Sequence, residues 1–527
     1  MSSVVIDASR SETLTSESAA HQSPLPEDRR AGVCMHVTSL PSRYGIGEIG
    51  HGAMEFIDTI KSMGLKVWQF LPLGPTAYGN SPYQPLSSFA GNELLIDTAG
   101  LIRMGLVKPS EAAELRELPE DVVDYGALIP VKNRLLGRAA DRFEARASVE
   151  LKNACEEFVE AHNELWLHDY ALYRILKSRH GHRAWPEWDR SFVRREAGPM
   201  RRLEEFARDQ VAEIKIIQFL FHHQWAELRR HATEQGILLF GDMPIYIAFD
   251  SADAWSHPEI LRVDKDGRPD KVAGVPPDYF SEDGQLWGNP LYDWDHHQAQ
   301  GYRWWIERMR HTMTLMDLVR VDHFRGFEAF WSVPADATTA KDGIWEPGPR
   351  DAIFEAMRQA LGYMPIIAED LGVITDEVDG LRERQQIPGM KVLQFEVEEA
   401  DFDAAEIEDQ CVCYTGTHDN DTTVGWFHGG PGDVRTPEQV VEARKLALRH
   451  TGGTADTIHL DLIRLGLETD ARISLALMQD YLGLGSEARL NTPGTSGDNW
   501  RWRLQQEQLT PELRESIRQM VAASGRI

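Results

Sequence analysis

The chain has 527 residues, with 55 Lys and Arg against 83 Asp and Glu, so its formal net charge is −28. Such an acidic protein repels phosphate backbones and anionic lipid, so we expect neither nucleic acid nor a membrane surface as a partner. No run of about 18 apolar residues is present, which excludes a membrane-spanning helix. Four cysteines are too few for a disulfide framework in a chain of this size, which is typical of a reducing compartment.

The first 28 residues differ in composition from the rest. They are rich in Ser, Thr and acidic residues, end in a Pro-containing segment, and lack the basic start and apolar stretch of a secretory signal. We therefore predict a mobile N-terminal extension over residues 1–28, a folded catalytic domain over 29–527, and a cytoplasmic location.

Eight short apolar runs, each followed by polar, charged or turn residues, recur along the chain. They are residues 32–37, 67–71, 237–240, 318–321, 366–368, 392–395, 412–415 and 473–478. Helical patterns lie between many of them, for example at 50–63, 302–316 and 350–361. Buried strands that alternate with helices indicate a parallel sheet. A doubly wound open sheet would fit this alternation, but eight repeats and acids at several strand ends favour an α/β fold of the (β/α)8 TIM-barrel type.

Two intervals are too long to be simple connections. Residues from about 93 to 236 are highly charged and carry apolar residues at a 3.6-residue period, which predicts a helical insertion. Residues from about 243 to 300 are rich in Pro, Gly, Asp and aromatic residues, which is typical of an ordered binding loop. The sequence therefore predicts a barrel with inserted helical and loop-rich subdomains.

Four acids, Asp242, Asp322, Glu369 and Asp419, stand at or just after the ends of predicted strands. In a parallel barrel these strand ends share one rim, where active sites lie. Carboxylates crowded on one rim repel one another, so the cluster requires a functional explanation. A divalent metal site and glycoside chemistry by paired carboxylates would both use it.

The neighbours of these acids favour a sugar over a metal. Aromatic faces pack on the C–H face of a pyranose ring, and amides and carboxylates bond its hydroxyls. The candidate sugar-binding residues in the rim loop and the loop insertion are Tyr78, Tyr83, Asp278, Gln285, Trp287 and Asn289. Further metal ligands are not evident at suitable spacing, so we predict no metal site.

Eight long motifs, in order, resemble those of the amylomaltases, the 4-α-glucanotransferases or disproportionating enzymes of glycoside hydrolase family 77 in the α-amylase clan. The resemblance extends from about residue 32 to 502. One departure is Leu490, where the family pattern has Met, a swap that conserves volume. The motifs are HVTSLPSRYGIGEIG (36–50), YGNSPYQPLSSFAGN (78–92), GDMPIYIAFDSADAW (241–255), GVPPDYFSEDGQLWGNP (274–290), VRVDHFRGF (319–327), IIAEDLG (366–372), YTGTHDNDTTVGW (414–426) and NTPGTSGDNWRWR (491–503).

The resemblance implies a role for each acid. It makes Asp322 the nucleophile, Glu369 the general acid/base, and Asp419 the third acid, which holds sugar hydroxyls. Arg320 lies two residues before Asp322, on the same face of the strand, where a guanidinium would keep the nucleophile ionised.

Among the remaining polar residues of the rim, His418 is expected to donate to a sugar hydroxyl, and Asp242 to support the site without reacting. The implied reaction is a retaining double displacement. A segment of an α-1,4-glucan is held on Asp322 and then passes to the 4-hydroxyl of another glucan or of glucose. The substrates are malto-oligosaccharides and α-1,4-glucans, and the chemistry needs no metal or organic cofactor. The sequence leaves the oligomeric state open.

Two other functions fit the same residues. A hydrolase would use the same three acids and differ only in accepting water. A non-catalytic glycan-binding protein on an inactive barrel would retain the aromatic loops, but it would not need all three acids.

Overall fold

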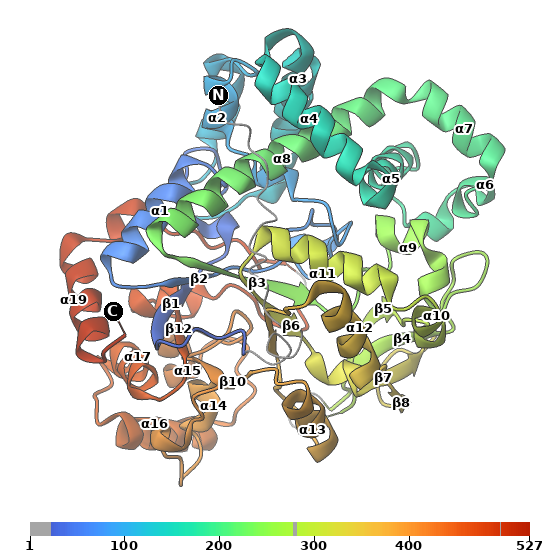
Figure 1. The fold of residues 1–527 in the computed structure, drawn as a ribbon. Helices are drawn as coiled ribbons and strands as arrows, with labels where there is room; N and C mark the ends of the chain where they lie inside the picture. The colour runs from blue at the N-terminus through green and yellow to red at the C-terminus, as the bar shows by residue number, and fades with distance from the viewer. Residues whose placement is uncertain (1–22, 278–281, 496, 527) are drawn as a thin grey trace.

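The computed structural model describes residues 23–277, 282–495 and 497–526. Eight parallel strands form its centre, with neighbours that follow the chain order around the sheet. The two ends of this order meet where the Ala368 amide donates to the Pro388 carbonyl at 2.8 Å. The predicted (β/α)8 barrel is therefore confirmed (Figure 1). Its strands are β1 (Arg30–Cys34), β2 (Val67–Gln69), β3 (Leu238–Pro244), β6 (Leu318–Asp322), β9 (Ile366–Ala368), β10 (Gly389–Val392), β11 (Cys411–Tyr414) and β12 (Ile473–Leu477).

Alternate residues of these strands fill the barrel, because side chains of a strand point to opposite faces in turn. One apolar cluster joins Val67, Phe240, Leu318, Ile367, Met390, Val392, Val412, Tyr414, Ile473 and Leu475. β1 presents Gly32 to this cluster, and an added Cβ there would lie 2.6 Å from Leu475 Cδ2. Two residues beyond Phe240, Leu318 and Ile367, the same inward face carries Asp242, Arg320 and Glu369. The barrel is thus apolar at its base and charged at the carboxyl ends of its strands.

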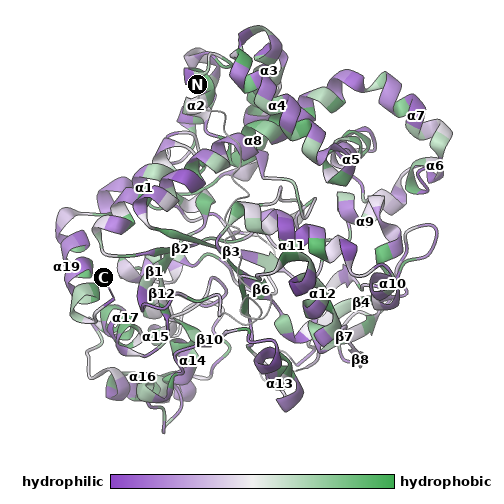
Figure 2. Ribbon diagram, in the orientation of Figure 1, coloured by the Kyte–Doolittle hydropathy of each residue, from purple (hydrophilic) through white to green (hydrophobic). Residues whose placement is uncertain are grey.

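Helices surround the barrel, and Figure 2 shows polar residues dominating an outer one such as α13. The helices predicted at 50–63, 302–316 and 350–361 are present as α1 (His51–Ser62), α11 (Arg303–Leu315) and α12 (Asp351–Leu361). The others on the barrel wall include α13 (Asp376–Arg384), α15 (Thr423–His428), α16 (Pro437–Thr451), α17 (Ile458–Glu468), α18 (Met478–Tyr481) and α19 (Pro511–Ala523). No helix among the described residues is both long enough and apolar enough to cross a membrane.

The interval between β2 and β3 is helical and stands on one side of the barrel (Figure 1). A buried ion pair ties it to the barrel, where the ammonium of Lys132 contacts the Glu48 carboxylate and lies 2.9 Å from Thr98 Oγ1. The residues of this pair are at most 6% exposed, so the contact fixes the position of the insertion. The helices are α2 (Thr98–Arg103), α3 (Tyr125–Arg146), α4 (Val149–His162), α5 (His168–Arg179), α6 (Arg190–Val193), α7 (Ala197–Phe206) and α8 (Arg208–Gln235).

A second, antiparallel sheet lies beside the barrel, with strand order β5-β4-β7-β8. Its strands are β4 (Lys271–Val275), β5 (Gln285–Pro290), β7 (Ala329–Pro334) and β8 (Ile344–Pro347). The interval 243–300 supplies β4 and β5 and two short helices, α9 (Ala252–Ser256) and α10 (Trp294–Ala299). The other two strands, β7 and β8, come after β6 in the chain. The predicted binding loop therefore supplies only two of the four strands of this sheet.

Two sequence expectations need comment. The strand predicted at 392–395 is wrong, because β10 ends at Val392 and α14 (Leu393–Glu396) follows it. A short apolar run does not distinguish a strand from a buried helical turn.

Residues 23–28, which the sequence assigned to the extension, contact the barrel through Leu25, a member of the interior cluster. Residues 1–22 lie outside the described part of the chain, so the mobility of the extension stays a prediction.

Candidate active site

An arginine joins two of the four acids. Arg320 Nη1 lies 2.8 Å from Asp242 Oδ2, and Arg320 Nη2 lies 3.0 Å from Asp322 Oδ1. Arg320 and Asp242 are register partners on the adjacent strands β6 and β3, which explains why their side chains meet. Their side chains are buried, whereas that of Asp322 is 31% exposed. The buried arginine thus contacts the Asp322 carboxylate from inside the barrel, while part of that side chain stays exposed to solvent.

Glu369, immediately after β9, is bound to the turn that follows Asp322. Its Oε2 accepts the backbone N–H of His323 at 2.7 Å, and its Oε1 accepts that of Leu371 at 3.0 Å. His323 has a left-handed backbone, with φ 56°, which few non-glycine residues adopt. This strained turn directs its N–H to Glu369, so the two carboxyl groups are fixed to one short piece of backbone.

Burial raises the pKa of both Asp322 and Glu369 above the ordinary values for these side chains. The Arg320 guanidinium opposes this shift at both residues, and the neighbouring carboxylates of Asp242 and Glu369 add to it at Asp322. Two N–H bonds, from His323 and Leu371, also favour the ionised form of Glu369. Raised pKa values allow one carboxyl to carry a proton while the other is charged, as acid/base glycoside chemistry requires.

Asp419 lies on the loop after β11 and is held by residues from the C-terminal part of the chain. Its Oδ1 accepts Asn491 Nδ2 at 2.6 Å and lies 3.4 Å from His418 Nε2. Its backbone carbonyl accepts Arg489 Nη2 at 2.8 Å. We did not predict Asn491 or Arg489 as site residues. Their only signal in the sequence was their place in or beside the last family motif.

Tyr83 connects the rim loop to the charged residues. Its hydroxyl donates to Asp242 Oδ2 at 2.8 Å, and its ring stacks on His418 with centroids 5.0 Å apart. The ring of Trp500, which the sequence analysis missed, lies 6.1 Å from each of these two rings. Burial keeps the pKa of Tyr83 high and lowers that of His418, so the phenol stays a donor and the imidazole is neutral.

The loop insertion brings Trp287 to the same place. The rings of Trp287 and His323 are in edge-to-face contact, with their centroids 4.8 Å apart. The Trp287 Nε1 donates to Gln285 Oε1 at 3.1 Å. Trp287 therefore stands beside the turn that carries Asp322. Asn289 is buried instead, and it donates to the Ile247 carbonyl at 2.9 Å.

Two further candidates are less informative. Asp278 lies outside the described residues, and Tyr78 begins a short 3-10 turn, Tyr78–Asn80.

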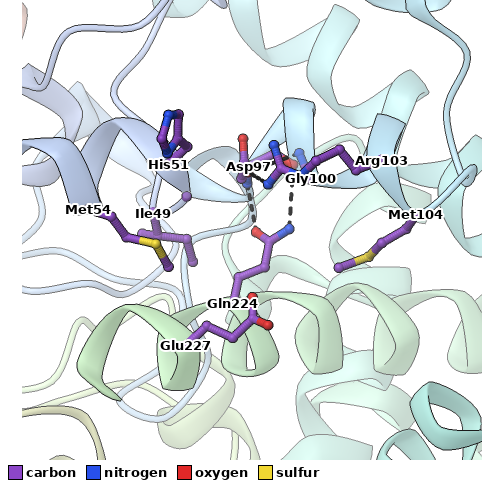
Figure 3. A pocket seen from close by; sticks show the side chains of 10 residues that line it. Ile49, His51, Met54, Asp97, Gly100, Arg103, Met104, Gln224 and Glu227 are labelled. Atoms are coloured by element: carbon purple, nitrogen blue, oxygen red, sulfur yellow. Dashed lines mark hydrogen bonds and ion pairs between the residues drawn. The ribbon is translucent and has the colours of Figure 1, made fainter. Parts of the chain in front are cut away.

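A separate pocket lies between α1, α2 and α8, where Met54, Asp97 and Arg103 are among its lining residues (Figure 3). None of the four acids lines it, so it is not part of the candidate active site.

Comparison with known proteins places this site in a family. A family model described as 4-alpha-glucanotransferase matches residues 35–510. The chain belongs to this family. It is 43% identical to the 4-alpha-glucanotransferase of Thermus thermophilus over 509 residues, which is 95% of this chain and 99% of the relative. The Synechocystis relative of the same name is 41% identical over 92% of this chain and 96% of its own.

A solved structure agrees with this assignment. The amylomaltase from Streptococcus agalactiae, solved in complex with acarbose, superposes with a TM-score of 0.89 at 34% identity, covering 94% of this chain and 99% of its own. The amylomaltase from Corynebacterium glutamicum shares the fold, with a TM-score of 0.76 at 19% identity, covering 95% of this chain and 75% of its own. The predicted family is confirmed, and the chain is an enzyme with 4-α-glucanotransferase activity.

Proposed function

We propose that this enzyme transfers segments of α-1,4-glucans by a retaining double displacement through a covalent glycosyl ester on Asp322. The observation that carries the proposal is the pairing of Asp322 with Arg320 at 3.0 Å beside a Glu369 carboxyl bound to the same turn. Direct contact with the guanidinium favours the charge on Asp322. In this proposal the second carboxyl of the pair, Glu369, then carries the proton.

In the first step, Glu369 donates its proton to the oxygen of the scissile glycosidic bond. An oxygen of the Asp322 carboxylate attacks the anomeric carbon, the C–O bond breaks, and the reducing-end part of the glucan leaves with a free 4-hydroxyl. Arg320 and Asp242 keep the attacking carboxylate in place during this step.

In the second step, Glu369 is a carboxylate and takes the proton from the 4-hydroxyl of an acceptor glucan or of glucose. The acceptor oxygen attacks the anomeric carbon and Asp322 leaves as a carboxylate. Two inversions at one carbon preserve the α configuration. This chemistry needs no metal and no organic cofactor.

The remaining residues bind the sugar in this proposal. Asp419, fixed by Asn491, accepts from sugar hydroxyls, His418 donates to one, and Trp287 offers an aromatic face beside the reacting ring. Tyr83 contributes through its ring and hydroxyl. The same role stays a prediction for Tyr78, Asp278, Gln285 and Asn289. The expected substrates are malto-oligosaccharides and longer α-1,4-glucans.

The proposal extends to the organisation of the chain. We treat the barrel as the catalytic domain over residues 29–527, with the helical insertion at about 93–236 and the substrate-binding insertion at about 243–300. A cytoplasmic location and the absence of nucleic-acid or membrane partners follow from the composition and stay predictions. The oligomeric state is open.

The decisive experiment incubates the pure protein with maltotriose alone and follows the products by chromatography. Transfer yields glucose together with a ladder of longer malto-oligosaccharides. A hydrolase, the main alternative, would yield glucose and maltose with nothing longer than the substrate. Asp322→Asn should abolish product formation, whereas Asp379→Asn, an exposed acid on α13, should leave it unchanged.

The covalent step has its own test. In Glu369→Gln, an α-maltosyl fluoride can still react with Asp322, because fluoride leaves without a proton. The acceptor is then no longer activated, so a glycosylated enzyme should accumulate. Mass spectrometry of its peptides should locate the sugar on Asp322. A sugar on another residue would exclude Asp322 as the nucleophile.

A further inference from the structure

Arg325 lies three residues after Asp322, in the short 3-10 turn Phe324–Phe327, and it is 5% exposed. Its guanidinium carbon lies 3.8 Å from the ring centroid of Trp345, on β8 of the antiparallel sheet. Its Nη1 donates to the carbonyl of Val373, in the loop that follows Glu369. One side chain therefore contacts the Asp322 turn, the second sheet and the Glu369 loop.

The Glu369 loop is held at its ends by packing and polar contacts: Leu371 packs against the interior cluster and Ile374 against the main core. The Asp370 carboxylate accepts the Met390 amide at 2.8 Å and lies 3.3 Å from Arg382 Nε, which holds the start of the loop. Beyond it, Gly372 has a left-handed backbone with φ 85°, and Val373 is 50% exposed. The bond from Arg325 thus restrains the exposed part of the loop.

This restraint bears on Glu369, since the loop also supplies one of its hydrogen bonds. The Leu371 N–H, between Asp370 and the Val373 carbonyl that Arg325 holds, donates to Glu369 Oε1 at 3.0 Å. If the loop moves outward at Val373, the Leu371 amide moves with it. The opposite oxygen of Glu369 keeps its bond to His323.

We propose that Arg325, clamped by Trp345, is a positioning residue for Glu369: it holds the loop at 371–374 so that the Leu371 N–H stays on the Glu369 carboxylate. The indole favours the cation on its face and covers the guanidinium, so the bond to the Val373 carbonyl is shielded from water. The proposal rests on the proposed acid/base role of Glu369. In this proposal the antiparallel sheet, through Trp345, helps to position Glu369 relative to Asp322.

A direct contact between Arg325 and the sugar is the main competing role. Its side chain is nearly covered, so it has little surface for a ligand. The two roles differ in kinetics. A binding residue changes KM, whereas a positioning residue changes kcat and the pH profile of the group that it positions.

The test compares Arg325→Met and Arg325→Lys with the wild type, using maltotriose disproportionation across pH. Arg325→Met should lower kcat about 10-fold or more with KM within about twofold. The Leu371 bond favours ionised Glu369, so its loss should raise the Glu369 pKa. Because Glu369 must be protonated to act as the acid, the alkaline side of the pH profile of kcat should then move to higher pH by about half a unit or more. Arg320, Asp322 and Asp370, the charged groups that interact with Glu369, are unchanged in these variants.

Lysine should recover part of kcat, because an ammonium can reach the Val373 carbonyl but cannot lie flat on Trp345. The matched control is Arg229→Met. Arg229 also donates to backbone carbonyls, including that of Met313 at 2.9 Å, but this carbonyl lies in the last turn of α11, at the opposite end of β6. The Arg229→Met variant should leave the alkaline side of the kcat profile at the wild-type pH.

Three results would overturn the inference: a wild-type kcat and pH profile in Arg325→Met, a raised KM at constant kcat, or a uniform loss at every pH that Arg229→Met reproduces. Glu369→Gln separates this outcome from a failure of the proposed function. If Glu369→Gln is inactive while Arg325→Met is normal, only the inference fails. If Glu369→Gln keeps wild-type activity, the proposed acid/base role itself is wrong.

Discussion

The rings of Tyr83 and His418 stack with their centroids 5.0 Å apart and their planes inclined by 12°. The Tyr83 hydroxyl continues from this stack to Asp242 at 2.8 Å, and Asp242 in turn contacts Arg320. The rim loop is therefore connected to the nucleophile pair through one phenol. Two properties of Tyr83, its ring and its hydroxyl, can be separated by mutation.

Tyr83→Phe keeps the ring and removes the bond to Asp242. Loss of a hydrogen bond to a charged group costs about 1.5–3 kcal/mol, so kcat/KM for maltotriose should fall by about 10- to 100-fold. Tyr83→Ala also removes the stack on His418 and should reduce kcat/KM further. Steady-state kinetics of both variants measure the two contributions. Equal losses in the two variants would contradict a role for the stack.

Arg320 should control the ionisation of Asp322. Its guanidinium lowers the pKa of that carboxyl against burial, so its removal should raise the pKa further. Activity requires ionised Asp322, and the acidic limb of the kcat/KM profile should therefore move to higher pH in Arg320→Lys, where one ammonium cannot reach both carboxylates. We expect kcat to fall at least about 100-fold, since breaking a buried pair costs about 3–5 kcal/mol.

The control for this prediction is the folded state, because Arg320 is also a core residue. Circular dichroism and the melting temperature should establish that Arg320→Lys folds. An acidic limb at the wild-type pH in a folded variant would mean that Arg320 does not set the charge of Asp322.

The barrel could be predicted from the sequence because its strands repeat a local pattern. Leu318, Arg320 and Asp322 alternate with apolar residues, and period two alone places all three on one inward face. The carboxyl end of that face then becomes a shared rim. All four acids, Asp242, Asp322, Glu369 and Asp419, also lie in motifs that resemble those of the family.

What the sequence missed depends on contacts between distant segments. Asn491 and Trp500 reach Asp419 and Tyr83 only after the chain returns from β12, and no local pattern marks that path. The antiparallel sheet pairs β4 with β7 across β6, so neither half is recognisable alone. The error at 392–395 has a local cause, since Leu393 and Gln394 are buried whether the backbone is extended or helical.

Buried histidines should make the enzyme sensitive to acid. Burial, with the neighbouring His162, lowers the pKa of His311 to about 4, while its unfolded value is about 6.5. Below pH 6.5 the unfolded chain takes up a proton that the folded chain refuses, so stability is fully present above that pH and is lost as pH falls towards 4. His311 alone should contribute about 2 kcal/mol of this loss at pH 5.

The measurement is the melting temperature at pH 7.5 and pH 5 for the wild type and His311→Gln. The variant lacks the titrating group, so its melting temperature should fall less over this range. At pH 7.5 the wild type should be more stable, because His311 Nε2 bonds the Phe89 carbonyl at 2.8 Å. Equal falls in both proteins would mean that His311 does not stay neutral in the folded state.

Arg526, near the C-terminus, should be a stabilising anchor that is remote from catalysis. It is fully buried and donates to the carbonyls of Leu467 and Thr469, each at 2.7 Å, and of Ala471 at 2.8 Å. These carbonyls end α17 and precede β12, where a cation is favourable and an unpaired carbonyl is costly. Arg526→Met should therefore lower stability by about 3 kcal/mol or more and reduce the melting temperature by several degrees.

Arg518→Met is the matched control, since Arg518 lies on the preceding helix α19 and pairs only on the surface with Glu515. An exposed pair of this kind contributes less than about 1 kcal/mol, so the melting temperature should barely change. Both variants should keep the wild-type kcat for maltotriose at 25 °C, because neither residue contacts the acids. A large fall in kcat for folded Arg526→Met would show that the end of the chain is coupled to the active site through β12.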